Sequence, residues 1–436
     1  MFLVSKNKIK HWLGTTIVFT SICISWPVLA DNATSTQIID CRASEYFNGW
    51  PQEGMKLGGH IPNAVNIRAQ WLDNMSVAER THFLVDQKQL NKNQPIKIYC
   101  DSGNAKKLQQ QLTGIDFKSV AIMQKPLSDF QDQLVALPHF KTLVSPRWLN
   151  LLVSHSSSND AQLVAAPQHD FKIIEAGWGP ATGYLLSHVK GAIYANTNDF
   201  ESKPLWNVVP PAQLQQNIEK LGITQDTTVV LYGRDNLGAA RIAQILMYAG
   251  VKDVRLLDGG WEAWQAADLP TQSGNNSVKN VVKFGAKVPA HPEYITDVSQ
   301  VKIMLKDSDN NSLVSVRTWS EYIGDTSGYS YIKPKGRVDG AKWGQGGKNS
   351  NNLDDFTNPD GTMRSASEIQ SKWQAWNIRT DQKVSFYCGT GWRASAVFLY
   401  AYAMGWNNIS VFDGGWYQWS LDGNNPTLTG TPSAVH

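Results

Sequence analysis

A cysteine followed by a short glycine-containing loop and an arginine is the part of this chain best suited to chemistry. Cys388 ends an apolar stretch that predicts a β-strand, and an alanine-rich apolar stretch that predicts a helix begins a few residues later. The residues between them, and the arginine, are Gly389, Thr390, Gly391, Trp392 and Arg393. We therefore expect Cys388 to lie at a helix N-terminus, where free N–H groups and the helix dipole favour an anion.

The composition of this loop favours a thiolate over a thiol. Gly389 and Gly391 allow the backbone to curl so that successive N–H groups point inward. Arg393 adds a positive charge five residues after the cysteine. Because the thiolate is the nucleophilic form, Cys388 is the predicted catalytic nucleophile. The alternative is a small core cysteine, which we would expect inside the strand and not at its exit.

The strand, loop and helix around Cys388 recur in the chain. Residues 229–264 align without a gap to residues 384–419, and both copies end in Asp-Gly-Gly-Trp followed three residues later by a second Trp. A weaker copy occupies residues 96–123. Each copy has the order strand, turn, helix, Gly, strand, which is a βαβ unit. The predicted class is therefore α/β, with parallel sheets that carry helices on both faces.

Composition places the boundaries between the repeats. We expect domains at 31–143, 144–270 and 285–430. Residues 144–152 predict a helix opened by Ser145 and Pro146, so the second repeat begins there and the polar stretch 154–170 is a loop within it. A second stretch, 268–294, contains three Pro and separates the second and third repeats.

The N-terminus predicts an export signal. Lys6, Lys8 and Lys10 precede an apolar stretch, and Val28-Leu29-Ala30 resembles a cleavage site, so residues 1–30 are the expected signal peptide. A membrane anchor is the alternative, but the stretch is short and contains Pro27. The formal net charge is +3, and removal of three Lys without any acid leaves 3 − 3 = 0. A neutral mature chain does not favour nucleic-acid or membrane-surface binding, and we expect a periplasmic protein.

The motifs together resemble the rhodanese (thiosulfate sulfurtransferase) family. They are the Cys-Gly-Thr-Gly-Trp-Arg loop, the downstream Asp-Gly-Gly-Trp, and Val316-Arg317 with Glu321-Tyr322 upstream. The resemblance covers nearly the whole mature chain as three tandem rhodanese-like domains. It implies a small anionic sulfur donor, a thiophilic acceptor such as cyanide, a dithiol or a protein thiol, and no cofactor. We expect no metal site and a monomer.

Within this resemblance only the third repeat has the full loop. The second repeat has Gly233 at the nucleophile position and Gly238 at the arginine position, so we expect it to be inactive. The first repeat is degenerate, with Cys100 followed by Asp101, which would repel a thiolate and an anionic donor. After the signal peptide leaves with Cys23, three Cys remain, and the odd count predicts one free thiol.

Cys41 and Cys100 are the pair that would form a disulfide if any did, because both lie at strand exits. We expect both to remain thiols, with the disulfide as the alternative. His60, in the Gly-His-Ile-Pro segment of the first repeat, is expected to be a structural hydrogen-bonding group and not a ligand. The third repeat has Ser315 where the family has Asp, which weakens the transfer of a substrate-binding role to Arg317.

The resemblance implies a persulfide mechanism. Cys388 would take the outer sulfur of thiosulfate and pass it to the acceptor, while the loop N–H groups bind the sulfur and Arg393 binds the donor's sulfonate or relieves charge at the loop. Trp392 and Trp416 are expected either to wall the pocket or to belong to the core. A persulfide carrier or protein-binding module is the main alternative function. A cysteine phosphatase would need five residues between Cys and Arg, where this chain has four, and a cysteine hydrolase would need a nearby His base.

Overall fold

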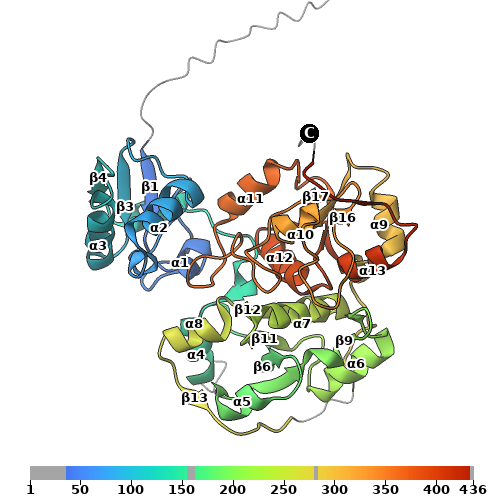
Figure 1. The fold of residues 1–436 in the computed structure, drawn as a ribbon. Coiled ribbons are helices and arrows are strands. Elements are labelled where there is room, and N and C mark those ends of the chain that lie inside the picture. The colour runs from blue at the N-terminus through green and yellow to red at the C-terminus, as the bar shows by residue number, and fades with distance from the viewer. Residues whose placement is uncertain (1–35, 155–162, 279–282, 433–436) are drawn as a thin grey trace, which may run out of the picture. The chain divides into compact units, whose positions relative to one another are not determined.

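The computed structural model describes residues 36–154, 163–278 and 283–432. The predicted signal peptide lies outside these residues. Figure 1 follows the three repeats along the chain, from blue through green and yellow to red. Each repeat has its own sheet, and every neighbouring pair of strands in these three sheets is parallel, which confirms the prediction from the βαβ pattern.

The first repeat contains a four-stranded sheet with the order β2-β1-β3-β4. Its strands are β1 (Gln37–Asp40), β2 (Val65–Asn66), β3 (Ile96–Tyr99) and β4 (Val120–Ile122). Its α-helices are α1 (Ser44–Asn48), α2 (Val77–Thr81) and α3 (Ser102–Thr113). It also contains the 3₁₀ helices η1 (Ala69–Leu72), η3 (Leu127–Gln133) and η4 (Phe140–Thr142) and the π-helix η2 (His82–Gln87). The strand, helix and strand predicted for the weaker copy at residues 96–123 are thus β3, α3 and β4.

The second repeat contains a five-stranded sheet with the order β5-β12-β11-β6-β8. The strands are β5 (Leu143–Val144), β6 (Phe171–Gly177), β8 (Ile193–Asn196), β11 (Thr228–Gly233) and β12 (Asp253–Leu257). The helices are α4 (Pro146–Ser154), α5 (Thr182–Leu186), α6 (Pro211–Lys220), α7 (Asn236–Ala249) and α8 (Gly260–Ala266). Two short antiparallel pairs join β7 (His188–Val189) to β13 (Thr271–Gln272) and β9 (Glu201–Ser202) to β10 (Asn207–Val208), and η5 is Thr197–Asp199. The helix predicted from Ser145 and Pro146 is α4.

The third repeat contains a five-stranded sheet with the order β14-β19-β18-β15-β17. The strands are β14 (Ile295–Thr296), β15 (Asn311–Ser315), β17 (Lys342–Trp343), β18 (Lys383–Tyr387) and β19 (Ile409–Phe412). The helices are α9 (Val298–Met304), α10 (Trp319–Ile323), α11 (Ala366–Gln374), α12 (Trp392–Ala403) and α13 (Gly415–Leu421), with η6 at Pro292–Tyr294. An antiparallel pair joins β16 (Arg337–Val338) to β20 (Thr427–Leu428).

Alternating side chains of β11 show how helices cover both faces of a sheet. Val229 and Leu231 belong to the hydrophobic cluster that contains α7, whereas Val230 and Tyr232 belong to the cluster that contains α4 and α8. Strand side chains alternate between faces, so a strand buried on both sides is continuously apolar. The run of apolar residues in β11 therefore reflects a sheet with two covered faces.

Helices α7 and α12 bring the second and third repeats together. They pack against each other, and their buried side chains belong to one continuous hydrophobic cluster. Both helices are apolar around most of their circumference because a sheet covers one side and the partner helix covers another. Figure 1 shows α7 and α12 next to each other. Since each helix begins at the loop that follows the central strand of its repeat, the packing places residues of the second repeat beside the Cys388 loop. Among the described residues, no helix is both long and apolar enough to cross a membrane.

Candidate active site

Cys388 lies where the sequence predicted it, between the end of β18 and the start of α12. The residue is 1% exposed, and the N–H of Gly391 donates a hydrogen bond to its Sγ over 3.2 Å. Gly391 caps the helix with φ of 119°, a conformation that side chains with a Cβ rarely adopt. The glycine thus permits the turn that aims a backbone donor at the sulfur.

The Asp-Gly-Gly-Trp segment holds the loop from the other side. The N–H of Trp416 donates to the carbonyl of Cys388 over 2.9 Å, and the N–H of Tyr417 donates to the carbonyl of Gly389 over 3.1 Å. Because the C=O and N–H of a trans peptide point in opposite directions, the amides that follow these carbonyls point away from α13. A Cβ on Gly415 would lie 2.6 Å from the Gly389 carbonyl oxygen, so glycine is required for this close approach.

Arg393 is enclosed by a buried carboxylate. Its two terminal nitrogens donate to the two oxygens of Glu321 over 2.9 and 2.8 Å, and one of them also donates to the Tyr329 hydroxyl over 2.8 Å. Arg393 is 1% exposed and Glu321 is fully buried. Both terminal nitrogens of the guanidinium are therefore held inside the protein by Glu321, so Arg393 determines the shape of the loop.

Glu321 is itself held by α10 and by a second arginine. It closes a capping box with Thr318, and Arg317 contacts one of its oxygens over 3.5 Å. Burial opposes ionisation of Glu321, but the hydrogen bonds and charge of Arg393 outweigh burial and hold the pKa of the carboxyl below its usual range. Arg317 is fully buried and donates to the carbonyl of Gly336 over 2.8 Å, so in this structure it supports the fold and does not face a ligand.

Trp392 connects the loop to the second repeat. Its indole Nε1 donates to Oε1 of Glu201, in β9, over 2.6 Å. The far edge of its ring lies 3.3 Å from the position of a Cβ on Gly238, the counterpart of Arg393 in the second repeat. The glycine that replaces the arginine there makes room for Trp392. By contrast, Trp416 is fully buried and donates to the carbonyl of Pro334, so it belongs to the core.

Arg241 of α7 is a site residue that the sequence reasoning missed. It is fully buried, donates to Glu201 over 3.0 Å and also donates to Asp413 of the third repeat. A Cβ on Gly391 would lie 3.0 Å from its guanidinium carbon, so this cation backs the cysteine loop. Burial opposes its charge, but the two acids raise the pKa of Arg241 above its usual value. The available signal was that this arginine is the single charged residue of a mostly apolar helix.

Gly233 has no space for a larger side chain. A Cβ there would lie 2.4 Å from the carbonyl oxygen of Asp235 and 3.0 Å from that of Ala176. In this backbone the second repeat does not accommodate a cysteine at the position equivalent to Cys388, which agrees with the expectation that this repeat is inactive.

Gly233→Ala is expected to destabilise the protein by ~1–3 kcal/mol because the new methyl group meets backbone atoms. Thermal unfolding should detect this as a lower midpoint. Gly103→Ala is the matched control: its Cβ would meet only Asp101 Oδ1, at 3.4 Å, within helix α3. Equal midpoints for the two variants would contradict the proposed steric limit.

The first repeat corrects our expectation of two free thiols. Cys41 and Cys100 form a disulfide, with their Cα atoms 5.3 Å apart. They follow β1 and β3, which are adjacent strands of one sheet, so the strand pairing places them within bonding distance. Cys388 is the free cysteine among the described residues. The Nδ1–H of His60 donates a hydrogen bond to the carbonyl of Phe47 over 2.8 Å, which is the structural role that we expected.

Replacement of both Cys41 and Cys100 by serine is expected to lower stability without lowering sulfur transfer. The disulfide joins residues 59 apart, and loss of such a cross-link costs ~2–4 kcal/mol through the greater freedom of the unfolded chain. Thermal unfolding and turnover of the double variant test both parts. The wild-type protein in excess reductant should unfold at the same midpoint as the double variant. A large loss of turnover in either sample would contradict the prediction and give the first repeat a role in catalysis.

A cavity of about 590 Å3 lies against the cysteine loop, between the second and third repeats. Thr390, Trp392 and Arg393 of the loop contribute to its wall, together with Glu201 and Asp235 of the second repeat. Cys388 lies behind this wall, with Tyr329 against Gly389. The structure thus brings the predicted loop residues together and adds a wall from the second repeat that the sequence did not indicate.

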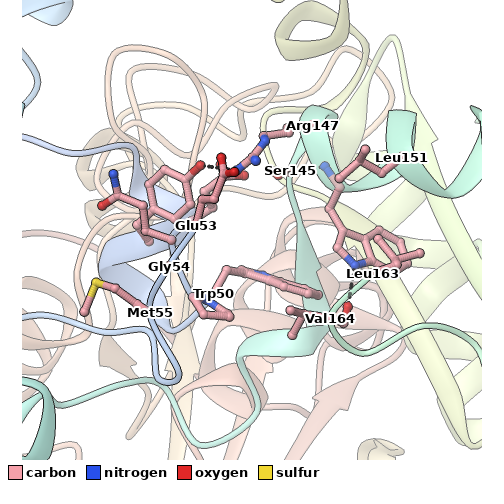
Figure 2. A pocket seen from close by; sticks show the side chains of 14 residues that line it. Trp50, Glu53, Gly54, Met55, Ser145, Arg147, Leu151, Leu163 and Val164 are labelled. Atoms are coloured by element: carbon pink, nitrogen blue, oxygen red, sulfur yellow. Dashed lines mark hydrogen bonds between the residues drawn. The ribbon is translucent and has the colours of Figure 1, made fainter. Parts of the chain in front are cut away.

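Figure 2 shows another cavity, of about 470 Å3, between the first and second repeats. Trp50 and Met55 line it from the first repeat, and Arg147 and Val164 line it from the second. None of the described residues that line it belongs to the third repeat, so this cavity is separate from the Cys388 loop.

Comparison with known proteins relates all three repeats to one family. The model of the rhodanese-like domain matches residues 28–133, 160–267 and 297–422. The thiosulfate sulfurtransferase YnjE of Escherichia coli (strain K12) is 49% identical over 393 residues, which cover 90% of this chain and 88% of YnjE. The sulfur carrier protein TtuD of Thermus thermophilus is 30% identical and covers 58% of this chain and 86% of TtuD.

Solved structures show the same similarity. The crystal structure of YnjE has a TM-score of 0.87 at 48% identity, covering 92% of this chain and 94% of YnjE. An anaerobic ergothioneine biosynthesis enzyme from Chlorobium limicola, in complex with its natural substrate trimethyl histidine, has a TM-score of 0.85 at 32% identity. That comparison covers 93% of this chain and 97% of the enzyme.

Proposed function

This chain belongs to the rhodanese family and is a sulfurtransferase, and from that premise we propose that Cys388 carries the transferred sulfur as a persulfide, with thiosulfate as the donor. The observation that carries the proposal is a buried cysteine sulfur that accepts a backbone hydrogen bond at the N-terminus of α12. The loop residues Gly389, Thr390, Gly391 and Trp392 bind the donor, and Arg393 holds the loop in shape.

In the first half-reaction the Cys388 thiolate attacks the outer sulfur of thiosulfate. A new S–S bond forms to Cys388, the bond between the two sulfurs of thiosulfate breaks, and its electron pair leaves with sulfite. The charge of the reactants, −1 and −2, is conserved in the persulfide anion and sulfite. No external oxidant or reductant is needed.

Backbone donors stabilise the sulfur anion. A hydrogen bond to a charged group contributes ~1.5–3 kcal/mol, whereas an exposed helix terminus contributes ~0.3–1 kcal/mol. The bond from Gly391 is therefore the larger contribution, and burial of Cys388 strengthens it by excluding water. Because both terminal nitrogens of Arg393 are bound by Glu321, it supports this geometry through the loop backbone and not as a free cation.

In the second half-reaction a thiophilic acceptor takes the sulfur. A thiolate attacks the outer sulfur of the protonated persulfide, the S–S bond to Cys388 breaks, and its electron pair returns to Cys388 as the thiolate. The acceptor leaves as its own persulfide, and cyanide would leave as thiocyanate. Because the enzyme alternates between free and sulfur-bearing forms, we expect ping-pong kinetics.

Persulfide trapping tests the proposal. After treatment with thiosulfate, the tryptic peptide that contains Cys388 should gain ~32 Da, the mass of one sulfur atom, and cyanide should remove the added mass. A gain on the Cys100 peptide, or no gain on any peptide, would contradict the assignment.

A persulfide carrier that serves a partner protein is the second candidate. One relative, TtuD of Thermus thermophilus, is named a sulfur carrier protein. The burial of Cys388 favours a small acceptor over a protein thiol, since a protein would have to reach a sulfur that is 1% exposed. Thiosulfate and cyanide separate the two functions, because a dedicated carrier would form the persulfide but turn over poorly.

We also propose that residues 1–30 are a signal peptide and that the mature protein is periplasmic. The charged and apolar composition of that segment supports export, and the Cys41–Cys100 disulfide is typical of an oxidising compartment. Cell fractionation with N-terminal sequencing tests this: the mature chain should begin after Ala30 in the periplasmic fraction. A full-length cytoplasmic protein would refute the proposal.

A further inference from the structure

Tyr329 presents a hydroxyl group beside the cysteine loop, at the wall of the cavity between the second and third repeats. A Cβ on Gly389 would lie 2.3 Å from Cε2 of the tyrosine ring and 2.8 Å from its hydroxyl oxygen. A terminal nitrogen of Arg393 donates a hydrogen bond to the same oxygen over 2.8 Å. The hydroxyl is therefore fixed between the residue that follows Cys388 and the arginine that closes the loop.

The hydroxyl proton of Tyr329 is not used within the protein. Tyr232, a buried tyrosine of the second repeat, accepts from the N–H of Val189 over 2.9 Å and donates to Glu175 over 2.9 Å. Tyr329 accepts from Arg393, but no group in the described parts of the chain accepts its proton. Because a phenol both donates and accepts, Tyr329 keeps one donor for a ligand of the cavity.

This donor remains protonated around neutral pH. Burial raises the pKa of Tyr329 above its usual value, and the positive charge of Arg393 offsets only part of that effect. The hydrogen bond from Arg393 also polarises the O–H group, since hydrogen bonds in a chain strengthen one another. Arg393, whose terminal nitrogens are held by Glu321, thus acts on the cavity through Tyr329.

The sulfonate is the part of thiosulfate that needs such a donor. Displacement requires the Sγ of Cys388, the outer sulfur and the sulfonate sulfur to lie nearly in line, so the sulfonate lies on the cavity side of the outer sulfur. The hydrogen bond from Gly391 goes to Sγ and does not serve the sulfonate. Negative charge grows on the sulfonate as the S–S bond breaks, and a donor placed at developing charge lowers the barrier.

We propose that the Tyr329 hydroxyl donates a hydrogen bond to a sulfonate oxygen of thiosulfate and stabilises sulfite as it leaves. This inference rests on the proposed persulfide function and adds a catalytic residue to its first half-reaction. The Cys388 thiolate forms the new S–S bond, the S–S bond of thiosulfate breaks, and its electron pair leaves with sulfite, while the proton stays on Tyr329. Discharge by cyanide does not involve this contact, because the sulfonate has already left.

Loading with two sulfur donors tests the assignment. Thiosulfate carries a sulfonate, whereas the hydrogen disulfide anion, HSS⁻, transfers its outer sulfur to Cys388 and releases HS⁻ with the electron pair of the broken bond. Persulfide formation on full-length wild type and Tyr329→Phe is followed by rapid quenching and mass measurement. We expect Tyr329→Phe to load about tenfold to about a hundredfold more slowly from thiosulfate, the range for one hydrogen bond to a charged group. Loading from HSS⁻ and discharge by cyanide should each change by less than about twofold.

Tyr184→Phe is the matched control for loss of a buried hydroxyl. This tyrosine donates to the carbonyl of Ala192 over 2.8 Å and is not part of the cavity wall. Both donors should therefore load Tyr184→Phe at the wild-type rates, whatever its thermal midpoint. Tyr329→Phe keeps its ring against Gly389 and leaves both bonds between Arg393 and Glu321, so we expect it to fold.

Salt separates this contact from general attraction of an anion. Lys203 is an exposed cation at the same wall, and its attraction for thiosulfate is screened by salt. The effect of Lys203→Met on loading should therefore fade between about 0.05 M and about 0.5 M salt. The effect of Tyr329→Phe should persist over this range, because a hydrogen bond acts at contact distance, and its loss at high salt would overturn the inference.

The outcomes distinguish this inference from the proposed function. If wild type gains no persulfide from thiosulfate, the proposed function fails. If wild type loads but Tyr329→Phe loads equally fast from thiosulfate, or is slowed equally with both donors, only the role of Tyr329 fails. Rates are expressed per site that HSS⁻ loads, so unfolded protein does not enter the comparison.

Discussion

Cys388→Ser is expected to remove sulfur transfer almost completely. Serine cannot form a persulfide, so the covalent intermediate and both half-reactions are lost together. Loss of a covalent nucleophile in another enzyme lowers kcat by ~10⁶-fold, and we expect a decrease of at least ~10⁴-fold here, to the limit of detection. Sulfite release on addition of thiosulfate and thiocyanate formation with cyanide measure the two halves separately.

The serine variant should retain the fold. Its hydroxyl is smaller than the thiol and accepts a hydrogen bond from the N–H of Gly391 in place of the sulfur. Circular dichroism and the thermal midpoint should therefore stay close to those of the wild-type protein. Turnover near the wild-type level would assign the chemistry to another residue, whereas loss of activity together with loss of structure would leave Cys388→Ala as the variant to measure.

The repeats and the cysteine loop were predictable because they depend on local sequence. An apolar strand, a turn and an apolar helix recur with a constant offset between residues 229–264 and 384–419, and the structure contains β11–α7 and β18–α12 at these positions. The placement of Cys388 follows from the same pattern. The parallel sheets follow as well, since a βαβ unit connects parallel strands.

The partners of the loop were not predictable, because they come from distant parts of the chain. Glu321 precedes Arg393 by 72 residues, and Glu201 precedes Trp392 by 191. Sequence alone could not decide whether Arg393 faces the donor or an internal carboxylate, because the answer depends on how α10 packs beside α12. The packing of α7 against α12 likewise brought Arg241 to the loop without any local pattern in the loop itself.

The disulfide illustrates the same limit. The strand exits of Cys41 and Cys100 were recognisable, but the choice between thiols and a disulfide depended on which strands are neighbours. In the sheet order of the first repeat, β1 and β3 are adjacent, and this adjacency decides the matter. The residue that occupies the nucleophile position in the first repeat is therefore used for a cross-link.

Among substitutions at the site that keep the shape of the replaced side chain, Glu321→Gln is expected to lower the stability of the protein most. The carboxylate binds the guanidinium of Arg393 with both oxygens and contacts Arg317, and all three groups are buried. An amide presents one acceptor oxygen and no charge, which leaves buried positive charge without compensation. Removal of one partner of a buried ion pair costs ~3–5 kcal/mol. Chemical denaturation followed by tryptophan fluorescence should show this loss.

The same variant should also lose sulfur transfer, because the loop depends on Arg393 for its shape. A decrease in the rate of persulfide formation, measured as sulfite release, is therefore expected together with the loss of stability. Glu262→Gln provides the matched control, since this glutamate is exposed at the start of α8. Unchanged stability and sulfite release in Glu321→Gln would show that the pair with Arg393 contributes little to the site.

The pH dependence of the difference between wild type and Glu321→Gln identifies the carboxylate as its source. The pKa of Glu321 is lower in the folded protein than the value of ~4.3 for an unfolded chain, because the hydrogen bonds and charge of Arg393 outweigh burial. The stabilisation is therefore complete above the unfolded pKa and is lost as the pH falls through the folded pKa. The difference in free energy of unfolding should be constant from about pH 6 to 8 and should shrink below about pH 4. A difference that stays constant into acid would attribute the effect to packing and not to the ionised carboxylate.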